Sequence, residues 1–268
     1  MVMAAEFNNF FGLTAAAVLG FGVVSHGSVL AAEELGPTAF RDGSYVSMSI
    51  GRQGLRVWGK TLKADGTSGG NASDESADIS SYSSQLNLAF GREFARDESL
   101  VLGYEVSISD LEGDHIGYDL RVNSSISSSI AYQQSPVLSL RRKVGVIRGR
   151  TMLFGTLGPA LLWEKQTRTQ YVQDGGNTAA TVVSFSETDS MVRIGAALSV
   201  GVRRAISTDW SMSFELHHVL LVPQTFHFAN ARGGVLTGNN GGYNDVQGRN
   251  AESAFRSTAF LIGLTRKF

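Results

Sequence analysis

The sequence predicts an all-β fold, a closed antiparallel up-and-down barrel of about eight strands that crosses a membrane. Apolar and polar residues alternate with a period of two through most of the chain, as on strands with two different faces. Short and long connections between these segments alternate strictly along the chain, which is typical of short periplasmic turns and long extracellular loops. One apolar segment near the N-terminus precedes all of them.

The composition excludes several classes of protein. Charged residues make up 18% of the 268 residues, and the formal net charge is -1, whereas an average soluble protein has roughly 25% charged residues. No basic stretch indicates nucleic-acid binding, so we expect no nucleic-acid partner. The chain has no cysteine, so disulfides do not hold the fold.

The N-terminal segment has the features of an export signal. Residues 10–24 are apolar and uncharged, and Val29 and Ala31 offer small residues for cleavage. We therefore predict a signal peptide over residues 1–31 and a barrel domain over residues 32–268. The alternative is a single membrane anchor, but a run of about 15 residues is shorter than the roughly 20 that a spanning helix needs.

Eight segments carry the period-two pattern. They cover residues 44–54, 84–94, 100–109, 137–147, 153–164, 191–203, 210–220 and 260–268. Three of the connections between them are about four or five residues long, and the other four are about 25 to 32 residues long. A soluble domain rarely contains four structureless loops of that length.

The composition of the two faces favours a lipid environment. A soluble exported barrel also alternates, with its apolar residues inside. Here the apolar phase is almost free of charge over about five or six positions per strand, enough to cross the hydrocarbon layer. The other phase is rich in Gly, Ser and Ala with isolated charges, which suits a narrow interior. Arg142 and Arg266 are exceptions, because both fall in the lipid-facing phase.

The charged residues of the inward phase carry both signs. We predict that they form an ion-pair network in the lumen, with Glu105–Arg141 and Glu215–Arg193 as the best pairs. The predicted network comprises Glu105, Arg141, Lys143, Arg193, Arg203 and Glu215, and Glu93, Glu164 and Lys267 share the same phase. Such a network is a structural plug; a small gated pore and a catalytic set are the alternatives.

Three aromatic residues occupy the ends of predicted strands. Trp163 lies where a strand meets a long loop, and Trp210 and Phe268 lie at the short-turn end. We expect them in the aromatic girdles at the two membrane interfaces. The alternative is that they are scattered core aromatics.

Several short motifs resemble the OmpA and opacity-protein type of outer-membrane barrel. They are LGYEVS at residues 102–107, LRRKVG at 140–145, TLGPA at 156–160, TDWS at 208–211 followed by Glu215, and GLTRKF at 263–268. The resemblance implies a Gram-negative outer-membrane location and an assembly signal formed by Gly263, Leu264 and Phe268, which the barrel-assembly machinery would read. Arg266 replaces the usual aromatic residue in that signal.

No sequence motif indicates an enzyme. Adjacent His217 and His218 invite comparison with barrel lipid A deacylases, but the expected His-x-Ser is absent. We expect no catalytic residue, no cofactor and no metal site. The predicted function is a structural surface protein whose partners are outer-membrane lipids and, through the loops, host-surface or envelope ligands. A narrow porin for small solutes and a lipid-modifying enzyme are the alternatives.

Overall fold

The computed structural model describes residues 40, 42–63, 76–96, 99–110, 116–121, 126–173, 181–232 and 247–268. The predicted signal peptide over residues 1–31 lies outside the described residues, as does the start of the predicted barrel domain. In the described part of the chain, no helix is long and apolar enough to cross a membrane.

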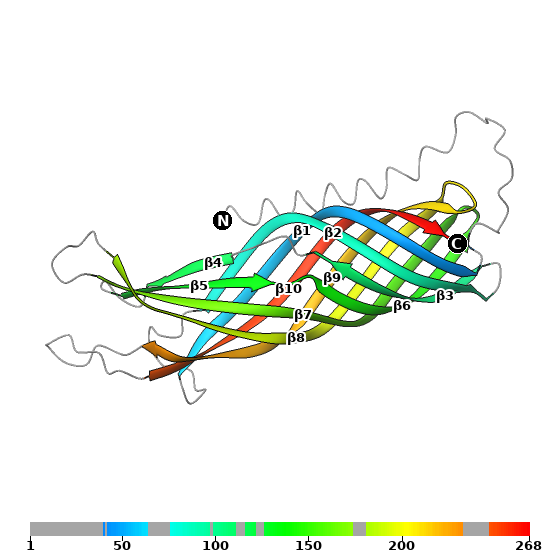
Figure 1. The fold of residues 1–268 in the computed structure, drawn as a ribbon. Coiled ribbons are helices and arrows are strands. Elements are labelled where there is room, and N and C mark those ends of the chain that lie inside the picture. Colours follow the sequence, from blue (N-terminus) through cyan, green and yellow to red (C-terminus); the bar gives the residue numbers. More distant parts are fainter. Residues whose placement is uncertain are drawn as a thin grey trace. The chain divides into compact units, whose positions relative to one another are not determined.

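The described residues form one antiparallel β-sheet. Its strands are β1 (Gly43–Lys63), β2 (Ser76–Ala95), β3 (Leu100–Ser109), β4 (Ile116–Arg121), β5 (Ile126–Gln134), β6 (Val137–Arg148), β7 (Thr151–Gln173), β8 (Thr181–Ala205), β9 (Trp210–Arg232) and β10 (Gln247–Lys267). All except β4 and β5 join in a ring, which the β1–β10 and β7–β8 pairings close (Figure 1). The predicted closed barrel of eight antiparallel strands is confirmed.

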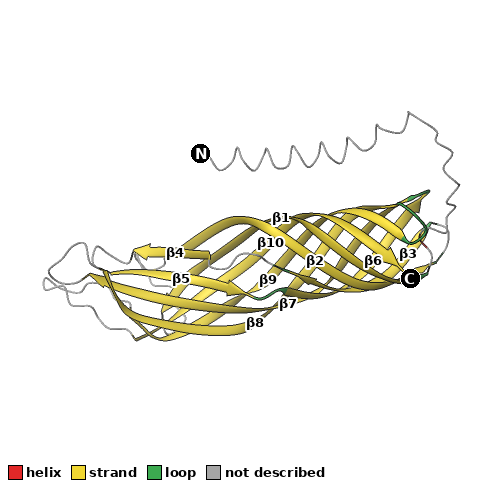
Figure 2. Cartoon of the chain, turned by 45° about the horizontal axis from the view of Figure 1, so that its top comes forward, coloured by secondary structure: helices red, strands yellow, loops and turns green. Residues whose placement is uncertain are grey.

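β4 and β5 form a hairpin outside this ring. β5 pairs with the far half of β7, beyond the part of β7 that pairs with β6. Ser135 and Pro136 separate β5 from β6, and proline has no N–H to offer the sheet. Figures 1 and 2 both place β4 and β5 at the end of the barrel opposite the C-terminus. We call this end the loop end, and the end with the short connections the turn end.

The strand register sets the tilt of the barrel. Following directly paired residues around the ring leads from Ser44 through Arg92, Tyr104, Arg142, Leu157, Leu198, His218 and Thr258 to Gly54. The path returns to β1 ten residues further along, so the strands are inclined to the barrel axis, by about 40° for eight strands at normal spacing. Directly paired residues on neighbouring strands therefore lie at different heights along the barrel axis.

The three short connections lie where the sequence predicts them. Gly149 and Arg150 separate β6 from β7, and the positive φ of 59° at Gly149 suits a residue without a Cβ. Residues 206–209 separate β8 from β9, and the N–H of Ile206 donates to the carbonyl oxygen of Trp210 at 2.8 Å. Tight turns of this kind fix the register of each hairpin.

The strands extend further towards the loop end than the alternation predicts. β7 and β8 remain paired to Gln173 and Thr181, within a segment that the sequence indicates is a long loop. The hydroxyl groups of Thr167 and Thr188 lie 3.0 Å apart across this pair. β-Branched threonines favour strand structure. The residues around them are polar in both phases, so the sequence shows no apolar alternation that would predict a strand there.

The closure of the ring can be tested by cross-linking. Met48 and Leu264 are paired residues of β1 and β10, so cysteines at both positions lie within disulfide range in a chain that has no other cysteine. We expect M48C/L264C to form a disulfide on mild oxidation. The product should keep its compact electrophoretic migration on heating until it is reduced.

A register-shifted pair supplies the control for this experiment. M48C/I262C moves one cysteine by two residues along the same face, and it should cross-link poorly. Equal cross-linking of the two pairs would contradict the register, and no cross-linking of either pair would contradict a closed ring.

Candidate functional site

The outer face of the barrel is apolar. Alternate residues of β6 are buried and exposed along its whole length, and large apolar side chains fill the exposed phase of the ring strands. They include Val46, Met48, Ile50, Leu88, Phe90, Val106, Ile108, Leu140, Val144, Leu157, Val200 and Ile262. A soluble barrel would bury this set, because monomeric soluble proteins rarely expose an apolar surface of such extent. The chain is therefore a transmembrane β-barrel whose apolar belt faces lipid.

The lumen contains a network of charged side chains near the turn end. Glu93 Oε2 lies 2.6 Å from Arg203 and 3.2 Å from Lys267, and Glu93 Oε1 lies 3.6 Å from Lys143. All four side chains are almost inaccessible to solvent. One carboxylate thus bridges cations from β6, β8 and β10.

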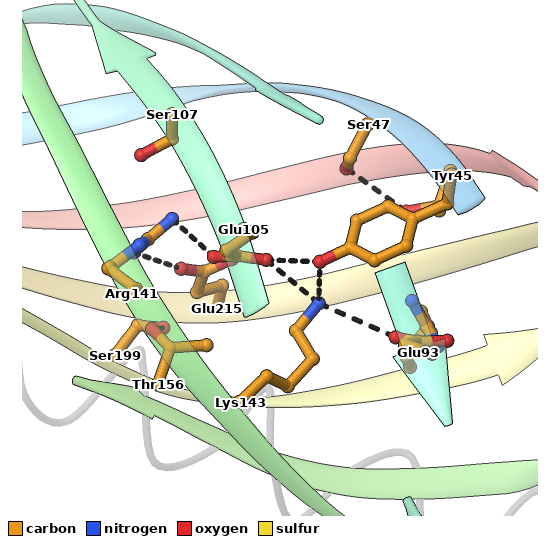
Figure 3. A network of polar contacts seen from close by, with 12 residues as sticks. Tyr45, Ser47, Glu93, Glu105, Ser107, Arg141, Lys143, Thr156, Ser199 and Glu215 are labelled. Carbon is orange, nitrogen blue, oxygen red and sulfur yellow. Dashed lines mark hydrogen bonds and ion pairs between the residues drawn. The ribbon is translucent and has the colours of Figure 1, made fainter. Parts of the chain in front are cut away.

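Glu105 connects this group to the far wall of the lumen (Figure 3). It accepts from Lys143 at 2.9 Å, from Arg141 at 2.7 Å and from the Tyr45 hydroxyl. Lys143 also donates to that hydroxyl at 2.5 Å. Arg141 reaches Glu215 at 3.4 Å. We call these eight residues the turn-end cluster: Tyr45, Glu93, Glu105, Arg141, Lys143, Arg203, Glu215 and Lys267.

A separate ion pair lies nearer the loop end. Arg193 donates to Glu164 at 2.7 Å, and both side chains are fully buried. Arg193 also donates to the hydroxyl and the carbonyl oxygen of Ser253, at 3.0 Å each. The prediction that Arg193 pairs with Glu215 is wrong, whereas the contact predicted between Glu105 and Arg141 is present.

Apolar side chains fill the lumen between these two charged groups. They form a cluster of buried residues, here called the apolar plug: Leu55, Val57, Tyr132, Val137, Ala160, Leu162, Ala197, Val219, Leu221 and Phe255. On β8, Ala197 lies between Arg193 and Arg203 in the inward phase. Sequence reasoning missed this plug, although the apolar runs at 160–162 and 219–222 interrupt the alternation there.

A second apolar cluster closes the turn end. Phe40 packs with Val101, Ile147, Met152, Phe154 and Ala205. The guanidinium carbon of Arg203 lies 5.3 Å from the centre of the Phe40 ring and 5.6 Å from that of Tyr45, a cation–π geometry. A water-sized cavity borders the turn-end cluster. Phe40 precedes β1, so the alternation of the strands gave no signal for it.

Trp163, Trp210 and Phe268 all point out of the barrel. Each is at least 40% exposed. The guanidinium carbon of Arg266 lies 5.6 Å from the ring centre of Trp210 and 5.3 Å from that of Phe268, so this lipid-facing charge is held between aromatic rings. Their role as interface anchors stays a prediction.

The residues of the predicted assembly signal differ in orientation. Gly263 points into the lumen, where a Cβ would lie 2.5 Å from the hydroxyl of Ser49 and 2.6 Å from that of Ser213. Leu264 and Phe268 face outward. Only glycine fits the inward position without displacing these hydroxyl groups. Recognition of the signal by assembly machinery stays a prediction.

The two adjacent histidines face opposite sides of the wall. His217 is buried in the lumen, and half-buried His218 lies on the outer face, where its Nδ1 is 2.8 Å from the Thr258 hydroxyl. They cannot share one ligand. Within the described ranges, no group of three or more histidine, aspartate or glutamate side chains could hold a metal ion.

Comparison with known proteins finds similar folds only. No family model and no curated protein matches the sequence. The outer membrane protein OprG from Pseudomonas aeruginosa is 11% identical over 86% of this chain and 98% of that chain, with a TM-score of 0.46. Neisserial surface protein A is 14% identical over 84% and 97%, with a TM-score of 0.34. The attachment invasion locus protein Ail of Yersinia pestis is 12% identical over 82% and 99%, with a TM-score of 0.31.

Two neighbouring arginines test the assignment of the faces. Arg141 is buried between Glu105 and Glu215, whereas Arg142 is exposed on the outer face. R141L leaves two carboxylates buried without this cation, and we expect the free energy of unfolding to fall by about 3–5 kcal/mol. Urea unfolding in lipid vesicles, followed by tryptophan fluorescence, measures this change.

R142L is the matched control for R141L. It removes a charge from the lipid-facing phase, where arginine costs from about 0 to 4 kcal/mol depending on its depth. Its free energy of unfolding should be unchanged or higher. A larger loss for R142L than for R141L would reverse the assignment of inside and outside.

Proposed function

We propose that the chain is an outer-membrane surface protein of a Gram-negative cell, which serves as a non-conducting anchor. It carries its long hairpins beyond the outer leaflet, where they contact host-surface or envelope ligands. The observation that carries the proposal is the filled lumen, in which the apolar plug separates the turn-end cluster from the Arg193–Glu164 pair.

The filling of the lumen favours an anchor over a porin. A conducting pore needs a continuous polar path, and an eight-stranded barrel has an interior just wide enough for side chains. Here the plug includes Phe255, Leu162 and Leu221, each no more than 3% exposed. The turn end is further filled by Phe40.

The long strands favour a role outside the membrane. Among the described side chains of β7, Trp163 is the last large apolar one that faces outward, and β7 continues for ten more residues to Gln173. At about 3.3 Å per residue and a tilt of about 40°, this extension rises roughly 25 Å above the belt. Loops held on such a scaffold are suited to recognition.

The two ends of the barrel favour the outer membrane. Its ring joins eight antiparallel strands by short connections at one end and long hairpins at the other, which is the organisation of outer-membrane barrels. The predicted export signal over residues 1–31 and the predicted assembly signal at Gly263, Leu264 and Phe268 would serve the same route to the membrane, through barrel-assembly machinery.

Planar-bilayer recording tests the closed lumen. The refolded barrel should insert without stable unitary conductance, because the plug leaves no continuous aqueous path. A known porin inserted by the same procedure provides the positive control. Reproducible unitary steps from this protein would instead support a narrow pore for small solutes.

Shortening the β7–β8 hairpin tests the surface role. Thr167 and Thr188 are paired residues, so an Asn-Gly turn can replace residues 168–187. The β6–β7 and β8–β9 pairings lie entirely outside this cut, and the ring should still form. Cells that display the shortened barrel should adhere less to epithelial monolayers than cells with the full chain. Equal adhesion at equal surface level would contradict a role for this hairpin.

A further inference from the structure

Two arginines and a tyrosine form a row across the lipid-facing side of three neighbouring strands, near the turn end. Arg92 of β2 is directly paired with Tyr104 of β3, and Tyr104 is directly paired with Arg142 of β6. All three side chains are exposed on the outer face. Directly paired Cα atoms lie about 4.5–5.5 Å apart, so those of the two arginines are about 10 Å apart, with the tyrosine between them. We call this row the arginine patch.

Apolar side chains surround the patch on the outer face. Phe90, Val106 and Leu140 flank it towards the loop end, and Val144 flanks it towards the turn end; each is at least 43% exposed. A charged side chain among lipid-facing apolar residues is unfavourable unless it extends to the headgroups or meets an opposite charge. The two arginines therefore favour an anionic group that reaches them from the membrane.

No acidic residue adjoins the patch on the outer face. Outside the row itself, Arg92 is paired with Ser44 and Arg142 with Leu157. Side chains are described for these residues and for the outward neighbours of the patch on β2, β3 and β6, and none of them is acidic. Glu93 adjoins Arg92 in the chain but is buried in the lumen, on the other side of the wall.

The side chain of Arg92 extends towards the turn end. Its guanidinium carbon lies 5.2 Å from the ring centre of Phe94, which is two residues closer to that end. The Phe94 ring lies 6.1 Å from the Tyr104 ring. Within the described ranges, the Arg142 guanidinium group has no hydrogen-bond or ion-pair partner. Both cations are thus available to a headgroup at the turn-end surface of the membrane.

We propose that the arginine patch binds the phosphate of an anionic glycerophospholipid in the leaflet at the turn end. A guanidinium group binds phosphate oxygens through two parallel hydrogen bonds, and both arginines can reach one phosphate above Tyr104. The acyl chains of the same lipid would lie along Phe90, Val106 and Leu140. The apolar surroundings favour a lipid over a soluble anion. The identity of this leaflet as the periplasmic one rests on the proposed outer-membrane location.

The opposite side of the barrel supplies a matched pair of arginines. Arg204 of β8 and Arg266 of β10 also face outward near the turn end, on the two strands that flank β9, across the ring from β3. Arg266 is held between the rings of Trp210 and Phe268. Neutralising Arg204 and Arg266 removes the same charge from the same edge of the belt, without touching the arginine patch.

Native mass spectrometry of the refolded barrel in detergent tests the proposal. The barrel is mixed with phosphatidylglycerol or with phosphatidylethanolamine of the same acyl chains, which has the same phosphodiester but no net charge. The wild-type chain should retain phosphatidylglycerol preferentially. R92Q/R142Q should retain at least about tenfold less of it, and R204Q/R266Q should retain as much as the wild type.

Three results would overturn the proposal: undiminished retention of phosphatidylglycerol by R92Q/R142Q, an equal loss in R204Q/R266Q, or equal retention of the two lipids by the wild-type chain. Heat-modifiable migration verifies that each variant folds. If R92Q/R142Q does not fold, R142Q alone should retain about fivefold less, and an unchanged value would overturn the proposal in the same way.

This experiment is independent of the tests of the proposed function. A negative result in the mass spectra would refute the arginine patch alone, because conductance and adhesion do not depend on it. Unitary conductance or unchanged adhesion would refute the proposed function and leave the patch standing. The unfolding of R142L is compared with that of R141L in zwitterionic vesicles, where no anionic lipid occupies the patch.

Discussion

The pairing of every backbone N–H and C=O group is the constraint on which the rest of the structure depends. In hydrocarbon, each unpaired group costs several kcal/mol, so the first and last strands, β1 and β10, must meet. With eight strands and a stagger of ten residues, the ring encloses a space that side chains fill. A closed ring of eight strands has a narrow interior, and its position in hydrocarbon requires an apolar outer face.

The interior then has to accommodate buried charge. Each carboxylate of the turn-end cluster lies within 3.4 Å of at least one cation, and Glu93 and Glu105 each contact more than one. Buried ion pairs are weak evidence for stability, but removing one partner from such a pair is costly. Removing a single charged side chain from the cluster should therefore destabilise the barrel, because it leaves its partners buried without a counter-charge. Together with the apolar plug, the cluster fills the lumen of the barrel.

The sequence was sufficient to locate the eight ring strands, though not their ends towards the loop end, and to assign the face of each residue within the predicted segments. Period-two alternation separates Arg141 from Arg142 without any structural information. It gives the phase of a residue but not its height in the barrel, which depends on the stagger between strands. Glu215 therefore meets Arg141 on the opposite wall and not Arg193 on the neighbouring strand.

The features that sequence reasoning missed depart from simple alternation. The apolar plug places Val219 and Leu221 in the phase that carries polar residues elsewhere on β9. β7 also continues through Thr167 and Thr169 to Gln173, where the sequence shows no run of alternating apolar residues. Phe40 closes the turn end from a position before the first strand, and only tertiary packing places it there.

A nitroxide scan along β3 tests the central claim most directly. The chain has no native cysteine, so single cysteines at residues 101–109 can each carry a spin label in the refolded, vesicle-bound protein. The account predicts that oxygen accessibility oscillates with a period of two, with high values at Leu102, Tyr104, Val106 and Ile108. Labels at Glu105 and Ser107 should be shielded from both oxygen and a water-soluble relaxation agent. The opposite pattern, with Glu105 in contact with water and Val106 shielded from lipid, would contradict it.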